Sequence, residues 1–279
     1  MAFGNWIKKH QLISFFVLSY IIMYGVMFGY IFLNPGQPLQ PWSLVWAVGI
    51  FSPTISAVFL SWVIGGAAEV KRLLSGFTRW KVGFGWYFAA LFLLLGPLVI
   101  ALVYIALGHP PVGLQPGVTV TAFLGIILFQ FFSGPLGEET GWRGFALPRL
   151  ESKYNALVSS LILGVIWTFW HLPFFYLTGA TQVGIPLPIY LFLVLTITLY
   201  LTWLYNNTRG SLVITTLAHF TYNLSSTLIA GVVILMPAMV FYITAGSLLF
   251  LMVIGVVIYY GPKNLSRKPV TELPFHREA

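Results

Sequence analysis

The chain has 279 residues, of which 58% are hydrophobic and only 7% are charged, and its formal net charge is +8. Because a soluble domain has about a quarter of its residues charged, this composition excludes a soluble globular protein and indicates a membrane protein. The absence of cysteine excludes disulfides, thiolate catalysis and cysteine-ligated metals. The basic residues form no patch interleaved with aromatic side chains, so no nucleic acid partner is predicted.

Apolar residues form about eight runs, each long enough for a helix that crosses a bilayer, which needs roughly 17–25 residues. The runs lie near 11–33, 42–65, 85–107, 119–142, 156–178, 186–205, 211–235 and 238–260. The sequence therefore predicts one all-α, polytopic membrane domain over residues 1–279, with about eight transmembrane helices embedded in a lipid bilayer.

Lysine and arginine are confined to every second connection between these runs, apart from one arginine at the end of the fourth run. The basic residues of these connections and of the termini are Lys8, Lys9, Lys71, Arg72, Arg79, Lys81, Arg149, Lys153, Arg209, Lys263, Arg267, Lys268 and Arg277. The alternate connections, which contain no charged residue, are 34–41, 108–118, 179–185 and 236–237. Since basic loops remain in the cytoplasm, we expect both termini there, with a basic cytoplasmic tail over 261–279. The pattern does not distinguish the cell membrane from the endoplasmic reticulum.

Most acidic residues accompany the basic segments, and two do not. Those in basic segments, where we expect solvated charges, are Glu69, Glu151, Glu272 and Glu278. Glu138 and Glu139 instead close the fourth apolar run together with Arg143, and His171 and His219 lie within later runs. Ionisable groups at membrane depth are costly and mark functional sites. These five residues are therefore the candidates for a site inside the membrane.

Helix geometry separates the two adjacent glutamates, because neighbours on a helix point about 100° apart. Glu139 and Arg143 are four residues apart, on one face, with the glutamate N-terminal as an ion pair prefers. We therefore expect Arg143 to neutralise Glu139 and Glu138 to project into a cavity, where a carboxylate can act as a general base. The alternative is that all three anchor the cytoplasmic end of the helix. The spacing Gly137-x-x-x-Gly141 allows another helix to approach closely.

Two later runs carry the remaining polar candidates. His171 precedes Pro173, which loosens the helix and frees backbone carbonyl groups. His219 and Asn223 are four residues apart and share one face of the seventh run. Each signal alone also fits an ordinary interhelical hydrogen bond. Together with Glu138, these residues predict a shared, water-filled cavity within the membrane that faces the cytoplasm.

The order of these motifs resembles that of a known family. The motifs are Glu138-Glu139-x-x-x-Arg143, an aromatic-rich segment that ends in His171, and His219-x-x-x-Asn223. Over about 119–230 they resemble the membrane-embedded CAAX-protease and bacteriocin-processing (Abi) family, whose best-known branch is the type II CAAX prenyl endopeptidase, the Ras-converting enzyme. One departure is Trp167, where that family usually has phenylalanine.

The resemblance implies an intramembrane endopeptidase that needs no cofactor and cleaves a lipidated, CAAX-type protein or peptide. Glu138 is then the general base that activates water, and His171 orients or polarises this water. His219 and Asn223 are expected to stabilise the oxyanion of the tetrahedral intermediate. The supporting residues are then Glu139, Arg143 and Trp167.

Three other functions remain open. One glutamate and two histidines can form a catalytic zinc site, although the chain contains no HExxH motif. Other branches of the family are linked to bacteriocin maturation or self-immunity, without prenylation. The non-enzymatic alternative is a transporter or membrane scaffold. No internal repeat supports a transporter, while helix-breaking residues favour one, namely Pro53, Pro97, Pro135 and Pro173.

Overall fold

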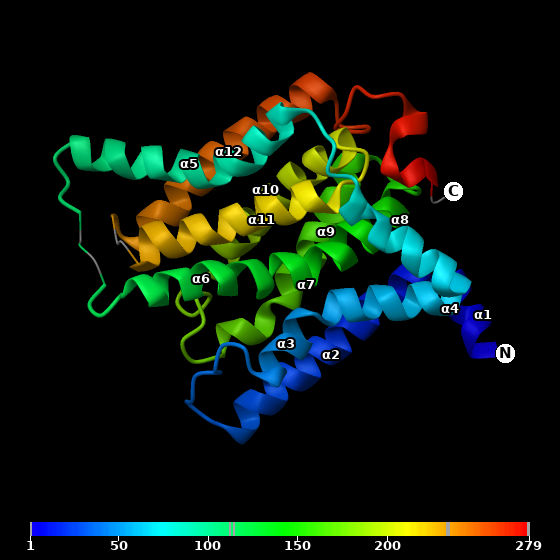
Figure 1. Ribbon diagram of the computed structural model, residues 1–279, viewed down its shortest axis with the longest axis horizontal. Coiled ribbons are helices and arrows are strands. Elements are labelled where there is room, and N and C mark those ends of the chain that lie inside the picture. The colour runs from blue at the N-terminus through cyan, green and yellow to red at the C-terminus, as the bar shows by residue number, and fades with distance from the viewer. Residues whose placement is uncertain (1, 112, 114, 233–234, 278–279) are drawn as a thin grey trace.

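The computed structural model describes residues 2–111, 113, 115–232 and 235–277. Within these ranges every regular element is helical, which confirms the all-α prediction. The long helices run along the long axis of the molecule and are joined at its two ends (Figure 1). The chain is therefore an all-α, polytopic membrane protein.

Six helical segments of the described chain are long and apolar enough to cross a membrane. They are Gln11–Leu33 (α2), Ser52–Thr78 (α4, Ser52–Leu74, with the short η1, Ser75–Thr78), Phe84–Ala106 (α5), Val120–Glu151 (α6 to α8), Leu187–Asn207 (α10) and Ala238–Tyr260 (α12). Each corresponds to one of the runs read from the sequence.

The other two predicted runs form shorter helices. α9 (Ala156–Trp170) and α11 (Leu212–Ser226) have 15 residues each. α9 gives way to a 3-10 turn, η3 (Leu172–Phe175), because Pro173 lacks the N–H group that a continued helix needs. α11 continues as a π-helical turn, η4 (Thr227–Val232). The predicted number of eight spans is therefore not confirmed.

The fourth run is broken beside the candidate glutamates. α6 (Val120–Phe132) ends before Gly134, whose φ of −150° and ψ of −76° are not helical. A new helix, α7 (Pro135–Glu139), starts with proline, which is well suited to a first helical position. It leads through a π-helical segment, η2 (Thr140–Ala146), into α8 (Leu147–Glu151). The break places the two glutamates on a short helix between longer ones. The remaining elements are α1 (Ala2–Lys9), α3 (Leu44–Ile50), η5 (Val270–Glu272) and η6 (Pro274–Arg277).

Two glycines let α4 approach α7 and η2 closely, as the sequence predicted. A Cβ atom on Gly137 would lie 2.9 Å from the Phe51 ring, and one on Gly141 would lie 2.5 Å from Pro53 Cβ. The approach is fixed by the Thr54 hydroxyl, which donates to the Gly137 carbonyl at 2.7 Å. A larger side chain at either glycine would separate the two helices.

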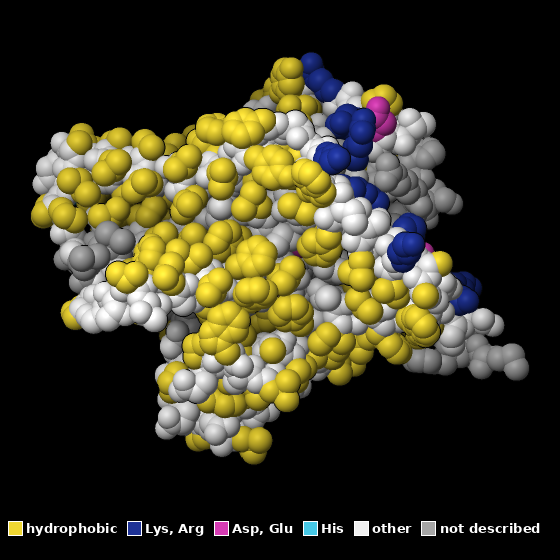
Figure 2. Space-filling model, viewed as in Figure 1, with side chains coloured by type: hydrophobic (Ala, Val, Ile, Leu, Met, Phe, Trp, Pro, Cys, Tyr) yellow, Lys and Arg dark blue, Asp and Glu magenta, His cyan; other side chains and the backbone are white. Residues whose placement is uncertain are grey.

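The charged connections meet at one end of the molecule. Arg149 forms an ion pair with Glu69 at 3.1 Å, Arg79 donates to the Arg209 carbonyl at 2.9 Å, and Arg209 pairs with Glu272 at 3.0 Å. Figure 2 shows lysine and arginine gathered there, at the end where Figure 1 marks both termini. We call this the basic end, formed by residues 8–9, 71–81, 149–155, 209–211 and 261–277. The opposite, uncharged end includes residues 34–43 and 177–186, which meet where a Cβ on Gly179 would lie 3.5 Å from Pro38 Cβ.

One expectation for the basic end needs correction. The expectation of a solvated Glu151 is wrong, because this side chain is buried and accepts a hydrogen bond from Asn206 Nδ2 at 2.7 Å. The described part of the tail is also packed against the helices, since Leu265 and Leu273 are fully buried. Apolar side chains in the tail thus anchor it. Glu278 lies outside the described residues.

Candidate active site

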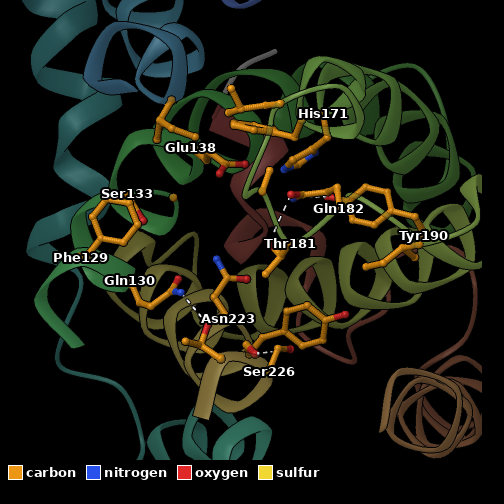
Figure 3. Close-up of a pocket in the computed structure, with 18 of the residues that line it drawn as sticks. Phe129, Gln130, Ser133, Glu138, His171, Thr181, Gln182, Tyr190, Asn223 and Ser226 are labelled. Carbon is orange, nitrogen blue, oxygen red and sulfur yellow. Dashed lines mark hydrogen bonds between the residues drawn. The ribbon is translucent and has the colours of Figure 1, made fainter. Parts of the chain in front are cut away.

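All four predicted catalytic residues line one cavity of about 340 Å³. Glu138 comes from α7, His171 lies directly after α9, and His219 and Asn223 come from α11. In Figure 3, Glu138 and His171 point into the same space, and the Asn223 amide points toward them from the opposite wall. The fold therefore brings together polar groups that are up to 85 residues apart in the sequence, from Glu138 to Asn223.

Glu138 is only 2% exposed, and its two carboxylate oxygens differ in their surroundings. Oε2 accepts a hydrogen bond from the Trp167 indole N–H at 2.6 Å. Oε1 lies beside Gly134, where an added Cβ would be 3.2 Å from this oxygen and 3.2 Å from Asn223 Nδ2. One oxygen is therefore held by the protein, while the other borders the space next to the Asn223 amide.

Glu139 lies behind the cavity in a buried ionic cluster. Its Oε1 accepts from Arg143 Nη1 at 2.7 Å and from His219 Nδ1 at 2.9 Å. The ion pair with Arg143 confirms the pairing predicted from their spacing. The contact with His219 was not predicted, because it joins two separate helices. Both Glu139 and Arg143 are fully buried, unlike charges that anchor a helix end in the headgroup region.

The backbone and Glu139 orient the two imidazole rings. His171 Nδ1 lies 2.8 Å from the Trp167 carbonyl, and since a carbonyl only accepts, this nitrogen carries the proton. In the neutral ring, His171 Nε2 is then a hydrogen-bond acceptor. His219 Nδ1 likewise donates to Glu139, so its Nε2 is the atom left for other partners. Each ring thus has one nitrogen fixed by the protein and the other available for chemistry.

Trp167 contacts Glu138, both histidines and Arg143. Besides its hydrogen bond to Glu138, its ring centroid lies 5.1 Å from that of His219 and 5.7 Å from that of His171. Arg143 Cζ lies 4.3 Å from the centroid, a cation–π distance. The sequence indicated a large aromatic residue in a supporting position. It did not reveal the hydrogen bond, which phenylalanine could not form.

Several lining residues were missed from the sequence. Gln130 joins α6 to η4 by donating to Thr227 Oγ1 at 2.6 Å, and Tyr190 packs its ring 5.6 Å from that of His171. Gln182 comes from the connection that follows η3. Gln130 had a readable signal, because it is the one polar side chain in the stretch 122–132. The other two lie near the ends of apolar runs, where polar residues are ordinary.

The donor set does not match the zinc alternative. Among the residues that the structure describes, no three histidine, aspartate or glutamate side chains are placed to share a metal ion. Glu138, His171 and His219 each have one atom engaged by a protein partner, as described above. Such hydrogen bonds also orient metal-ligating histidines, so it is the placement of the three groups that differs from the His₂Glu set of catalytic zinc sites.

A second cavity of about 600 Å³ adjoins the first, between α5, α11 and α12. Its lining is almost entirely aliphatic and aromatic, and Phe92 and Ile100 of α5 form part of its wall. The residues that line both cavities are Leu193, Tyr222, Ser226 and Tyr242. The cavity with the candidate catalytic groups therefore shares part of its wall with an apolar one.

Comparisons with known proteins find relatives for the segment that contains this site. Residues 119–225 match the family described as type II CAAX prenyl endopeptidase Rce1-like. The core of this chain is similar to type II CAAX prenyl endopeptidases. A protein named CAAX prenyl protease 2, from Methanococcus maripaludis, is 30% identical over 110 residues, which is 37% of this chain and 41% of that protein. The family resemblance predicted from the three motifs is confirmed, and the matched segment contains every candidate catalytic and supporting residue.

Proposed function

We propose that this protein is an intramembrane endopeptidase in which Glu138 activates the water that cleaves a peptide bond. The observation that carries the proposal is the convergence of one carboxylate, two oriented imidazoles and one amide on a single cavity. The similarity of residues 119–225 to a prenyl endopeptidase family supports it. A purely structural hydrogen-bond network would not need open space between these groups.

The reaction starts with a water molecule between Glu138 and His171. Glu138 Oε1 accepts one proton of this water, and His171 Nε2 accepts a hydrogen bond from the other, so the oxygen lone pair points at the scissile carbonyl. The water oxygen bonds to the carbonyl carbon, and the carbonyl oxygen becomes an oxyanion. When the carbon–nitrogen bond breaks, Glu138 returns its proton to the leaving amine. The products are a carboxylic acid and an amine, and the acid then transfers its remaining proton to the amine, which gives a carboxylate and an ammonium group.

Asn223 and His219 face the charge that forms during this reaction. Asn223 donates from Nδ2 without adding a buried charge, and a doubly protonated His219 donates from Nε2 while Glu139 holds its Nδ1–H. Fixed donors in a site without bulk water stabilise an oxyanion by about 2.7–4 kcal/mol each. The ionic cluster behind the cavity thereby positions one of the two donors.

We further propose that the substrate is a lipidated protein or peptide, with a prenylated CAAX end as the first candidate. The adjoining apolar cavity of about 600 Å³ has the lining expected for an isoprenoid or acyl chain, and it shares lining residues with the catalytic cavity. A peptide anchored there by its lipid would present its adjacent peptide bond to Glu138.

The test compares a farnesylated peptide with its unlipidated twin, using protein purified in detergent. We expect the farnesylated peptide to be cleaved faster, and Glu138→Gln to lower kcat by roughly 10²–10⁴-fold without loss of folding or substrate binding. Glu272→Gln, at the basic end, is the matched control and should retain full activity. Persistent cleavage by Glu138→Gln would show that the general-base assignment is wrong.

The same assay separates the alternatives. Equal cleavage of both peptides would indicate peptide processing unrelated to prenylation, as in bacteriocin maturation. Loss of cleavage with a membrane-permeant chelator, followed by recovery with added zinc, would establish the zinc-dependent alternative. Absence of cleavage across a broad panel of lipidated and plain peptides would favour a transporter or scaffold.

A further inference from the structure

The mouth of the catalytic cavity lies at the uncharged end of the molecule. The exposed residues among those that line it are Pro38, Pro41, Thr178, Gly179 and Thr181, and they belong to the connections 34–43 and 177–186. Glu138, His171 and His219 are buried beneath this rim. A substrate segment therefore reaches the catalytic groups from the side of these two connections.

Toward the basic end the site is closed. Trp142, Arg143 and Phe145 follow the glutamates along η2, and all three are fully buried. Trp142 and Phe145 pack against Phe15 of α2, with ring centroids 5.4 Å and 5.1 Å from its ring. Among the described residues that line the cavity, none comes from the basic end. A layer of packed aromatic side chains thus separates the catalytic groups from the charged connections.

The charge distribution fixes which side of the membrane each end faces. Apart from Arg143, every lysine and arginine of the sequence falls in the segments of the basic end. The uncharged segments 34–43 and 177–186 contain no ionisable Lys, Arg, Asp or Glu side chain. Because basic connections are retained in the cytoplasm, the basic end is the cytoplasmic one. The expected cytoplasmic termini and the expected cytoplasm-facing cavity therefore exclude each other.

We propose that the catalytic cavity opens on the extracytoplasmic side of the membrane. Its substrate is a peptide segment presented on that side, such as part of a secreted or membrane-anchored protein, with any lipid chain entering the apolar cavity from the bilayer. The rim is neutral and offers hydroxyl and backbone groups, which suits an extended, uncharged peptide. A prenylated CAAX end would reach Glu138 only when it is presented on that side of the membrane. The statement about the substrate rests on the proposed peptidase function, whereas the direction in which the cavity opens does not.

Site-directed labelling tests the direction of opening without any assay of activity. The chain has no cysteine, so each single-cysteine variant reports one position. Thr181→Cys is at the rim and Tyr154→Cys is exposed at the basic end. In sealed, right-side-out membrane vesicles, we expect a membrane-impermeant maleimide to label Thr181→Cys at least tenfold faster than Tyr154→Cys. Permeabilisation should make the two rates similar. The reverse order in sealed vesicles would overturn the proposal.

A second measurement determines on which side of the membrane the peptide is cleaved. A water-soluble fluorogenic peptide, cleaved by the detergent-solubilised protein, is added to the outside of right-side-out or inverted vesicles. We expect cleavage in right-side-out vesicles at once and in inverted vesicles only after detergent. Immediate cleavage in inverted vesicles would overturn the proposal. If the solubilised protein cleaves no peptide, the proposed function fails, while the labelling result still decides the direction of opening.

Discussion

Two adjacent glutamates occupy opposite environments in this protein. Glu139 lies in a fully buried cluster between Arg143 and His219, whereas Glu138 borders a cavity and is held by one neutral donor, the Trp167 indole. The separation follows from helix geometry, because consecutive side chains point about 100° apart. One carboxylate can therefore be fixed inside the protein while its neighbour remains available to water.

This contrast shows how a buried charge can serve a reaction without taking part in it. The Glu139 cluster neutralises Arg143 and holds the His219 ring, and this ring also lines the cavity. In the described structure, Glu138 accepts its hydrogen bond from a neutral indole rather than from a cation. We therefore expect substitutions behind the cavity to reduce stability first, and substitutions on its wall to reduce turnover first.

The largest effect on stability is expected for Glu139→Gln. The variant leaves the buried Arg143 cation without its counter-charge, and breaking a buried pair in this way costs about 3–5 kcal/mol. Thermal unfolding in detergent should show a much lower Tm than for Glu138→Gln, whose Tm should stay near that of the parent. The double variant Glu139→Gln/Arg143→Met, which removes both charges, should recover part of the loss. Equal Tm values for the two single variants would contradict a structural role for Glu139 that Glu138 does not share.

On the cavity wall, Asn223→Ala should have the largest effect after loss of the base itself. Removal of one oxyanion donor lowers kcat by roughly 10²–10³-fold in known cases. KM should change little, because the contact forms in the transition state rather than in the bound substrate. Ser226→Ala is a suitable control, since Ser226 lines the same cavity but donates to the Tyr222 carbonyl. A changed KM with an unchanged kcat would assign Asn223 to substrate binding.

A smaller loss of turnover is expected for Trp167→Phe. Phenylalanine keeps the ring against Arg143 and the histidines but cannot donate to Glu138, and a hydrogen bond to a charged group contributes about 1.5–3 kcal/mol. We expect kcat to fall by roughly 10–100-fold because the carboxylate is no longer held in one orientation. Trp170→Phe removes a comparable indole donor on the same helix, one that binds Ser52 Oγ at 3.1 Å. It should lower Tm and leave kcat unchanged, and a similar kcat loss in both variants would refute a specific role for Trp167.

The sequence was most informative where partners lie on one helix. The pairing of Glu139 with Arg143 and the approach of α4 at Gly137 follow from spacings of four residues, and both are present in the structure. The charge pattern also placed the connections correctly in two groups, one of which forms the basic end.

Contacts between helices could not be read in the same way. The bond from His219 to Glu139 and the bond from Trp167 to Glu138 depend on the rotation and depth of neighbouring helices. Hydrophobic runs also do not reveal where a helix stops inside the membrane, so the short α9 and α11 were missed. The direction in which the cavity opens depends on where these helices end relative to one another. It can be determined only once the residues that line the cavity are known.

The smallest loss of turnover is expected for Gly134→Ala, which narrows the space between Glu138 and Asn223. A methyl group in Gly134→Ala would lie 3.2 Å from both Glu138 Oε1 and Asn223 Nδ2, so each must move by a few tenths of an ångström. A misplacement of 1 Å can cost about 10²-fold in rate, and we expect this smaller shift to lower kcat by roughly three- to tenfold. Gly125→Ala, on α6, introduces the same methyl group with no atom within 4 Å and should leave kcat unchanged. Because neither change touches the Glu139 cluster, Tm should be similar in both. A fall in Tm for Gly134→Ala with unchanged kcat would mean that this glycine serves the helix break rather than the space beside the base.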